Sequence, residues 1–369
     1  MKKKIAGLIV AAGMSSRMKD FKPLMKVAGK PIIQHSIENL RAGGAQKILI
    51  VTGNRADDLQ PLLKKLSVSS IRNINYSTTD MFTSVKLGLA QLVNNYDAVF
   101  LLPGDVPLFM PYSLQAMIKL LDQSNNIAWV QPCYKGQGGH PVLINAACLE
   151  QILCYKGEDG LKGALTSCKG QRTDIDLPDR GILLDADTPE DYQKLCDYAQ
   201  VREIPDIDIC MEIYKLFKVP QKTIDHCMAV AQMAQEIADQ LAEAGYALDH
   251  RLVQAGAMLH DVAKGQKHHE LIGAKWLGDL GCLPVARVVG AHMDLPDDAI
   301  NNPDERAIVY LADKYVKGRT RVSIEQRFQE ALDRWQNDEA VNAAILKRMD
   351  KTKQLQKRVY ELIHNNKNK

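Results

Sequence analysis

The sequence predicts two consecutive units: an α/β unit with a mostly parallel sheet, followed by an all-α unit. Three observations predict this architecture. The chain has 369 residues, and domains usually contain roughly 100–200 residues. Up to about residue 198, short β-branched runs alternate with longer amphipathic stretches, as in a parallel sheet covered by helices on both faces. Beyond residue 210 apolar residues recur at helical spacing. We therefore expect domains at 1–198 and 199–369.

In the first unit, strands are expected where short apolar runs end in glycine, proline or polar residues. The first helix is expected at 31–44, because Pro31 suits a first helical turn and Gly43 with Gly44 ends the pattern. The strands are expected, in chain order, at residues 5–12, 47–53, 71–76, 97–104, 127–132 and 140–144.

In the second unit, no run reads as a strand. The segment 201–210, VREIPDIDIC, breaks the earlier alternation and is expected to be the linker. A long helix is expected at 223–245, where apolar residues recur at helical spacing up to Gly245. We expect six to eight helices in this unit and a frayed polar tail at 364–369.

The composition is that of an ordinary globular protein, with 46% hydrophobic and 25% charged residues. The net charge of +3 is too small and too evenly spread to favour nucleic acid or an anionic membrane as a partner. No apolar stretch approaches the roughly 20 residues of a membrane span. The eight cysteines form no C-x-x-C pair, which fits reduced thiols. We therefore expect a cytoplasmic protein.

A phosphate-binding loop is indicated after the first expected strand. There, LIVAAGMSSRM places a glycine and two hydroxyl residues before Arg17 and Lys22. Backbone N–H groups of such a turn, beyond the carboxyl end of a parallel strand, can contact phosphate oxygens. Asp105 in LLPGDVPLF ends another apolar strand, where a carboxylate can hold Mg²⁺ against a triphosphate. A plain strand-to-helix turn, and a turn-forming Asp between Gly104 and Pro107, are the alternatives.

A metal site is indicated in the second unit by His260 and Asp261, which end the apolar run in AMLHDVAKGQKHHE. Adjacent helical residues point about 100° apart, so other elements must complete the shell. His226 on the preceding helix is one candidate. Asp313 is another, because a carboxylate among apolar neighbours is costly to bury unless it is paired or binds metal. A surface position for His226 and an ion pair of Asp313 with Lys314 or a nearby arginine remain alternatives.

The first half of the chain resembles a known family over residues 4–198. The motifs GLIVAAGMSSRM, KPL, GKPI, PGDVPLF, GGHPVLI and LDADTPEDY follow in the order found in MobA-like nucleotidyltransferases. The chain looks most like the molybdenum cofactor cytidylyltransferases. The resemblance implies a Rossmann-like fold and Mg²⁺-dependent transfer of a nucleotide from a nucleoside triphosphate, CTP, to phosphorylated molybdopterin, with release of pyrophosphate. A molybdoenzyme that matures with the cofactor is the further partner it implies.

This resemblance also implies roles for single residues. Asp105 would hold Mg²⁺, and it would act with Arg17 and Lys22 to offset the charge of the reacting phosphates. Asp187 in DADTPED would be a second metal ligand or a helix N-cap. The segment 80–84, DMFTS, departs from the family's usual Gly-Met-Ser-Ser, which leaves base and acceptor recognition there open. The triphosphate and its base would be contacted by Ala11, Ala12, Gly13, Ser15, Arg17, Lys22 and Gly104.

The second half resembles the HD-domain metal-dependent phosphohydrolases over residues 211–320. His226, then His260 with Asp261, then Asp313 is the order of ligands in that family, and LHDVAKG is close to its doublet segment. The resemblance implies an all-α HD domain that hydrolyses a phosphate compound with one or two divalent transition metals, such as Fe, Mn, Co or Zn.

Further residues of this segment bear on the number of metals. His269 and His292 match the additional histidines of family members that hold two metals, and Asp261 is placed to bridge. His268 is expected to face solvent. Lys264 matches a family lysine that contacts substrate phosphate, and an i, i+3 ion pair with Asp261 is the alternative.

Two interpretations of the whole chain stay open. In the first, it is a bifunctional enzyme with two active sites. In the second, the transferase acts on another small phosphorylated or phosphonate acceptor, and the HD domain is a regulatory module that senses nucleotides.

Overall fold

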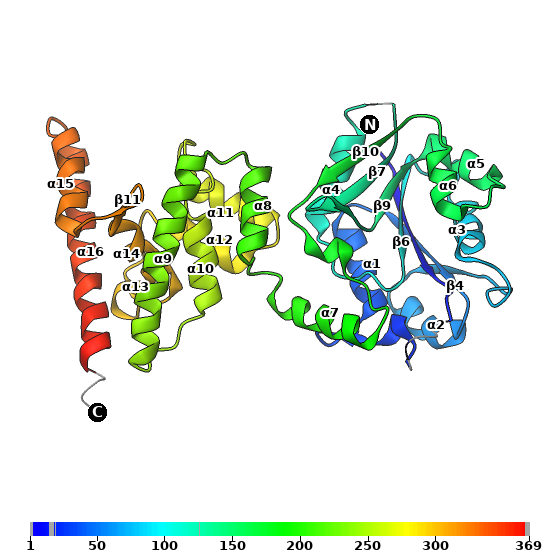
Figure 1. The fold of residues 1–369 in the computed structure, drawn as a ribbon, viewed down its shortest axis with the longest axis horizontal. Coiled ribbons are helices and arrows are strands. Elements are labelled where there is room, and N and C mark those ends of the chain that lie inside the picture. Colours follow the sequence, from blue (N-terminus) through cyan, green and yellow to red (C-terminus); the bar gives the residue numbers. More distant parts are fainter. Residues whose placement is uncertain (1–2, 15–17, 19, 125, 366–369) are drawn as a thin grey trace. The chain divides into compact units, whose positions relative to one another are not determined.

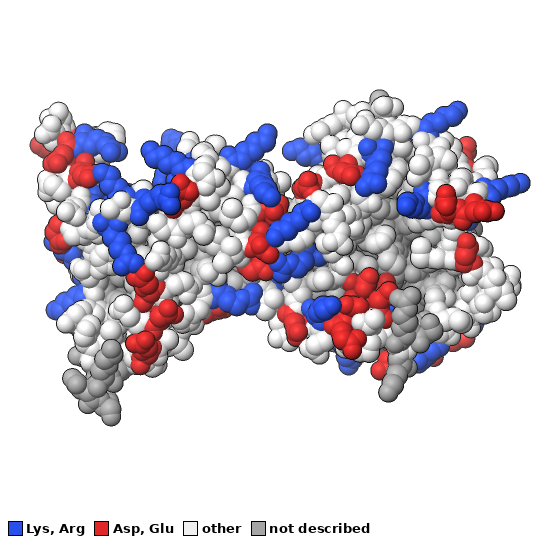
Figure 2. Space-filling model, in the orientation of Figure 1, with Lys and Arg blue, Asp and Glu red and all other residues white. Residues whose placement is uncertain are grey.

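The computed structural model describes residues 3–14, 18, 20–124 and 126–365. The chain divides into two compact units, Met1–Val201 and Arg202–Lys369. Basic and acidic side chains are interspersed on the face drawn in Figure 2, in line with the net charge of +3. Among the helices of the described ranges, none is both long and apolar enough to cross a membrane.

The first unit is built on a mostly parallel sheet, as predicted. Its strands are β1 (Ile5–Ala11), β4 (Lys47–Thr52), β5 (Ser69–Arg72), β6 (Ala98–Pro103), β7 (Ile127–Tyr134), β8 (Gln137–Gly138), β9 (Val142–Asn145) and β10 (Gln171–Asp176). Their order is β10-β7-β9-β6-β1-β4-β5, and β8 pairs with β7. On the main path only β9 runs against its neighbours, β6 and β7. The carboxyl ends of β1 and β6 therefore lie side by side.

Successive side chains of each strand point to opposite faces of the sheet. Helices cover both of these faces. The helices of this unit are α1 (Ile32–Ala42), α2 (Ala56–Lys65), α3 (Met81–Leu89), α4 (Pro111–Leu121), α5 (Ala146–Cys154), α6 (Gly160–Thr166) and α7 (Pro189–Val201). Leu8 and Val10 of β1 share a buried cluster with Val85 of α3. Gly7 faces α1, since a Cβ there would lie 2.8 Å from Cδ1 of Leu40. Figure 1 shows α1 and α4 on one side of the sheet and α3, α5 and α6 on the other.

The local expectations for this unit need three corrections. The strand expected at 71–76 ends at Arg72, because Asn73 Oδ1 accepts a hydrogen bond from the N–H of Asn75 and starts a turn. Pro31 precedes α1 as its N-cap. The edge strand β10 was missed, since its sequence QRTDID has no apolar run. Five short elements were also not expected: β2 (Lys26–Val27), β3 (Lys30–Pro31), β8 and the 3-10 helices η1 (Lys22–Leu24) and η2 (Arg180–Leu183).

The second unit is helical. Its helices are α8 (Ile207–Leu216), α9 (Gln221–Glu243), α10 (His250–Leu259), α11 (His269–Asp279), α12 (Leu283–Ala291), α13 (Asp298–Asn301), α14 (Glu305–Lys314), α15 (Ile324–Arg334) and α16 (Glu339–Asn365). The described residues thus form nine helices where six to eight were expected, because the four-residue α13 gives no periodic signal.

Two further expectations for this unit are wrong. The segment expected as linker at 201–210 contains the start of α8, because Asp206 caps it by accepting a hydrogen bond from the N–H of Ile209. The unit also contains an antiparallel pair, β11 (Val316–Lys317) with β12 (Thr320–Arg321). This hairpin turns at Gly318, whose φ is +59°, a conformation that glycine adopts at little cost.

A stability prediction follows from the packing of η2 against the loop after β6. A Cβ at Gly181 would overlap the backbone carbonyl of Leu108, which cannot rotate away as a side chain can. We expect Gly181→Ala to lower the free energy of unfolding of this unit by about 1–3 kcal/mol, and its melting temperature by about 2–4 °C per kcal/mol. Calorimetry of the full chain measures this, with the transition of the second unit as internal reference. An unchanged first transition would contradict the packing argument.

Candidate active sites

A pocket opens at the carboxyl ends of β1 and β6 in the first unit. The parallel register of the two strands pairs Val10 with Pro103, so the residues that follow each strand meet there. The pocket brings together six residues expected at a nucleotide site, namely Ala11, Ala12, Gly13, Lys22, Gly104 and Asp105. Ser15 and Arg17 lie outside the described residues.

Lys22 is the cation at the edge of this pocket. Its Nζ lies 3.0 Å from Oδ2 of Asp105 and 2.7 Å from Oδ1 of Asp187. Burial lowers the pKa of Lys22, but the hydrogen bonds and charges of the two carboxylates outweigh burial and raise it. The ammonium group is therefore charged at neutral pH and holds Asp187 beside Asp105.

A third carboxylate, Asp185, belongs to the same cluster. Burial, followed by the charges of Asp105 and Asp187, raises its pKa, and its Oδ1 accepts a hydrogen bond from the N–H of Asp187 at 3.3 Å. Lys22 pairs with two of these three carboxylates, so the cluster keeps excess negative charge, and carboxylate oxygens are the ligands that Mg²⁺ prefers. The residues present thus fit a magnesium ion. Sequence reasoning missed Asp185, although the Asp-x-Asp spacing in LDADTPED was a usable signal.

Thr188, and not its neighbour Asp187, caps helix α7. Thr188 Oγ1 accepts a hydrogen bond from the N–H of Asp191 at 3.2 Å, at the start of α7. Lys22 binds Asp187 on the pocket side. The geometry therefore places Asp187 beside Lys22, which also binds Asp105 at the pocket.

The divergent segment 80–84 forms part of the pocket wall through Asp80, Met81 and Ser84. Asp80 caps α3, because its Oδ1 accepts hydrogen bonds from the N–H and Oγ1 of Thr83 at 2.8 and 2.7 Å. Ser84 is buried and its Oγ accepts a hydrogen bond from Asn73 at 2.9 Å. This segment therefore lies where it can contact a bound nucleotide.

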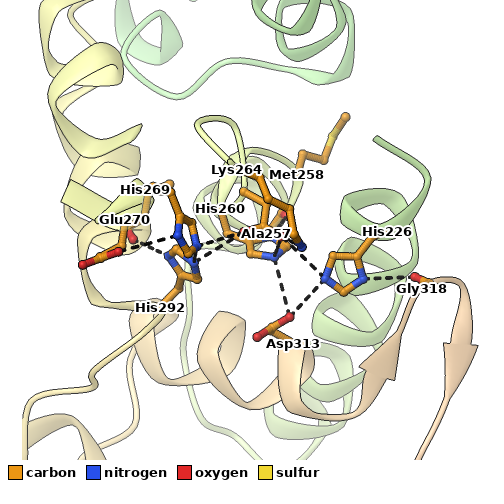
Figure 3. Close-up of polar contacts among 12 residues, drawn as sticks. His226, Ala257, Met258, His260, Lys264, His269, Glu270, His292, Asp313 and Gly318 are labelled. Carbon is orange, nitrogen blue, oxygen red and sulfur yellow. Dashed lines mark hydrogen bonds and ion pairs between the residues drawn. The ribbon is translucent and has the colours of Figure 1, made fainter. Parts of the chain in front are cut away.

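The second unit gathers six candidate metal ligands from five segments of the chain. Figure 3 shows the histidines and Asp313 converging from different elements. Each candidate stands at a helix end or on a buried helix face: His226 in α9, His260 as the C-cap of α10 with Asp261 next to it, His269 at the start of α11, His292 as the C-cap of α12, and Asp313 in α14.

These side chains form two groups that share Asp261. The first consists of His226, His260 and Asp261, whose ligand atoms all lie within 4.8 Å of one another. Asp313 joins it, because its Oδ1 lies 3.1 Å from Nε2 of His226 and 3.7 Å from Nε2 of His260. The second consists of Asp261, His269 and His292, within the same limit.

Asp261 uses a different oxygen toward each group. Its Oδ2 lies 3.5 Å from Nε2 of His260 and 3.9 Å from Nε2 of His226. Its Oδ1 lies 3.2 Å from Nε2 of His269 and 3.7 Å from Nε2 of His292. A carboxylate in this orientation can bridge two ions.

Backbone carbonyls orient three of the histidines. Each of these rings has its Nδ1 within hydrogen-bond distance of a carbonyl oxygen, which fixes the tautomer and leaves Nε2 for the centre of the cluster. Within the described chain, Nε2 of His260 is buried and has no hydrogen-bond partner, as expected of a metal ligand. The three pairs are His226 with Gly318 at 3.0 Å, His260 with Ala257 at 2.7 Å and His292 with Val289 at 2.7 Å.

The ionisation of the cluster also suits metal binding. Burial lowers the pKa of His260 to about 4, although the charges of Asp261 and Asp313 act to raise it. Burial raises the pKa of Asp261, but His260 and hydrogen bonds from His269 and His292 outweigh it and lower the pKa. Burial also raises the pKa of Asp313, but the charge of Lys314 and a hydrogen bond with His226 outweigh burial and lower it. Neutral imidazoles and ionised carboxylates are the forms that bind metal.

Residues around the cluster make several of the contacts that were considered as alternatives. Lys264 makes the i, i+3 ion pair with Asp261, and 49% of its side chain is exposed. Asp313 also pairs with Lys314, at 2.7 Å. The side chain of His268 is 65% exposed, as expected of a residue that faces solvent. Sequence reasoning missed Glu270, which lies 3.8 Å from Nδ1 of His269.

Comparison with known proteins yields two family models that match the chain. The model of the MobA-like NTP transferase domain matches residues 7–173, and the model of the HD domain matches residues 223–318. Both resemblances drawn from the sequence are therefore confirmed.

Single proteins match the first unit. Molybdenum cofactor cytidylyltransferase of Escherichia coli (strain K12) is 28% identical over 186 residues, which are 50% of this chain and 92% of that protein. Bifunctional protein GlmU of Staphylococcus epidermidis is 30% identical over 114 residues, so the chain spans only 25% of its length. A solved nucleotidyl transferase from Methanothermobacter thermautotroptrophicus is 17% identical with a TM-score of 0.45, and the match covers 54% of this chain and 99% of that one.

Proposed function

We propose a bifunctional enzyme for this chain, which belongs to the MobA-like NTP transferases in residues 7–173 and to the HD-domain family in residues 223–318. The first unit transfers a nucleotide from CTP to a phosphorylated acceptor, molybdopterin, and releases pyrophosphate. The second unit is a metal-dependent phosphohydrolase. The choice of CTP and molybdopterin draws on the cytidylyltransferase of Escherichia coli, to which half of this chain is similar.

The observation that carries the transferase proposal is the pairing of Lys22 with Asp105 and Asp187 at the edge of the pocket. An oxygen of the acceptor phosphate attacks the α-phosphorus of the triphosphate, the bond from that phosphorus to the β-phosphate oxygen breaks, and pyrophosphate leaves. Both reactants are anions, so the ammonium of Lys22 lowers their repulsion and stabilises the leaving group. Asp105, with Asp187, would hold Mg²⁺, which neutralises charge on the phosphates.

A direct assay tests this proposal. The full chain is incubated with MgCl₂, one of the four nucleoside triphosphates and either molybdopterin, a sugar phosphate or a polyol phosphate, and pyrophosphate is measured. We expect release only with CTP and molybdopterin together. Turnover of a sugar phosphate without turnover of molybdopterin would overturn the acceptor, and a preference for another triphosphate would overturn the base.

The observation that carries the hydrolase proposal is the bridging position of Asp261 between two ligand groups. Bound transition metals would supply Lewis-acid activation of water and would screen the phosphate oxygens. Burial keeps the His260 imidazole neutral at neutral pH, and Asp261 and Asp313, with their lowered pKa values, stay ionised. Lys264 is half exposed, so its ammonium can leave Asp261 for a substrate phosphate. A metal-loaded full chain without phosphatase activity on nucleotides or phosphomonoesters would favour the regulatory alternative.

The number of metals gives a separate prediction. His269→Ala removes a ligand of the second group only, so we expect the metal content to fall from two ions per chain to one. Mass spectrometry of metals in the dialysed protein measures this. His268→Ala is the matched control. The ring of His268 faces solvent, so this variant should keep two metal ions per chain. A His269→Ala variant that keeps both ions would contradict the assignment of the second group.

A further inference from the structure

His140 in the motif GGHPVLI has no role in the mechanism above. It precedes β9, whose antiparallel register on β6 pairs Val142 with Leu101. Its backbone N–H donates to the carbonyl of Ile182 at 2.8 Å, which ties it to the segment that leads to Asp185. His140 therefore lies at the end of β6, in the neighbourhood of Asp105.

The sheet order separates His140 from the nucleotide loop. β1, which carries Ala11 to Gly13, borders β6 on one side, and β9 borders it on the other. Among the described residues that line the nucleotide pocket, Asp105 is present and His140 is not. Asp105 is nevertheless close enough to act electrostatically on the His140 ring. The ring therefore stands on the flank of Asp105 away from the loop that would hold the triphosphate.

The imidazole of His140 has unused hydrogen-bonding capacity. Its Nδ1 is closed off from solvent and, within the described ranges, has no hydrogen-bond partner. Buried polar atoms without a partner are rare in folded proteins. An enclosed Nδ1 without an acceptor favours the tautomer with the hydrogen on Nε2, which makes Nε2 a donor. A donor near Asp105 suits a phosphate oxygen brought in by a substrate.

We infer that His140 positions the acceptor, by donating a hydrogen bond from its imidazole to the acceptor phosphate on the flank of Asp105 opposite the nucleotide loop. This inference rests on the proposed transferase function and deepens it. The nucleotide contacts the β1 side, the acceptor phosphate contacts the β9 side, and Asp105 lies between them. His140 takes no part in bond breaking, and the attacking phosphate needs no base.

The test compares three variants of the full chain. His140→Ala is expected to raise KM for the acceptor about tenfold or more, the effect of losing a hydrogen bond to a charged group, without changing the Kd for CTP measured with Mg²⁺. His140→Gln should recover part of the loss, because its amide nitrogen reaches the place of Nε2, whereas the shorter His140→Asn should not. Gln137→Ala, on the exposed strand β8 three residues before His140, is the control and should behave as the natural protein.

A second measurement needs no turnover. The ¹⁵N resonances of the His140 ring are followed while inorganic phosphate is added to the protein with MgCTP, and we expect them to shift. Either an absent shift or a His140→Ala variant with unchanged acceptor KM would overturn the inference, as would an equal loss of CTP affinity. A natural protein that turns over no acceptor would overturn the proposed function instead, and the phosphate titration would still decide the role of His140.

Discussion

Asp105→Asn is expected to lower kcat of the transferase by about 10²–10³-fold, the loss seen when a group that stabilises transition-state charge is removed. The substitution keeps the size of the side chain and removes the charge that would hold Mg²⁺. Lys22 then faces only Asp187 among its present partners, so its ammonium is also less firmly placed. The rate of pyrophosphate release at saturating CTP and acceptor measures the effect.

The control for this variant is Asp174→Asn. Asp174 lies on β10 of the same unit, pairs with Arg172 at 2.6 Å and is 52% exposed, so the change should leave both kcat and the melting temperature as they are. An Asp105→Asn enzyme that retains more than a tenth of the natural kcat would contradict the assignment of Asp105 as the metal-holding carboxylate.

The architecture of the first unit could be predicted from the sequence because its central strands are continuous apolar runs. Strands buried on both faces, such as β1 and β6, need such runs. The edge strand β10 needs none, since Arg172, Asp174 and Asp176 on one of its faces are exposed and no residue of the other face is fully buried, and its polar sequence QRTDID gave no signal. Asp185 was overlooked for a related reason. Its Asp-x-Asp spacing from Asp187 is visible in the sequence, but the approach of η2 and the following loop to the residues after β6, which brings it near Asp105, is not.

At the candidate metal site of the second unit, too, the sequence predicted the residues but not their arrangement. The spacing of histidines and carboxylates, together with the family resemblance, was enough to name the six side chains. It could not show that Gly318, on an unexpected hairpin, orients the ring of His226. Nor could it show which oxygen of Asp261 faces which group. Both depend on helices that are distant in sequence, because α9, α10, α11, α12 and α14 each contribute only one or two of the side chains.

The bridging position of Asp261 leads to the largest effect expected in this unit. Asp261→Ala removes a ligand from both groups at once, so we expect the chain to lose both metal ions and its phosphohydrolase activity to fall by at least about 10³-fold. His269→Ala, by contrast, disrupts one group. Metal content and phosphatase rate of the two variants, measured side by side, separate a shared ligand from a peripheral one.

In this comparison, a loss of metal must be distinguished from a loss of folded protein. Asp261 is buried and its charge interacts with His260, His269 and His292, so its removal also changes the stability of the unit. Asp261→Asn keeps the shape and hydrogen-bonding capacity of the side chain but not its charge, and it should fold while binding metal weakly. Asp279→Asn, whose exposed side chain pairs with Lys275 on α11, is the control and should keep both ions. If Asp261→Ala folds and still retains one full equivalent of metal, the two groups do not share this carboxylate and the bridged arrangement is wrong.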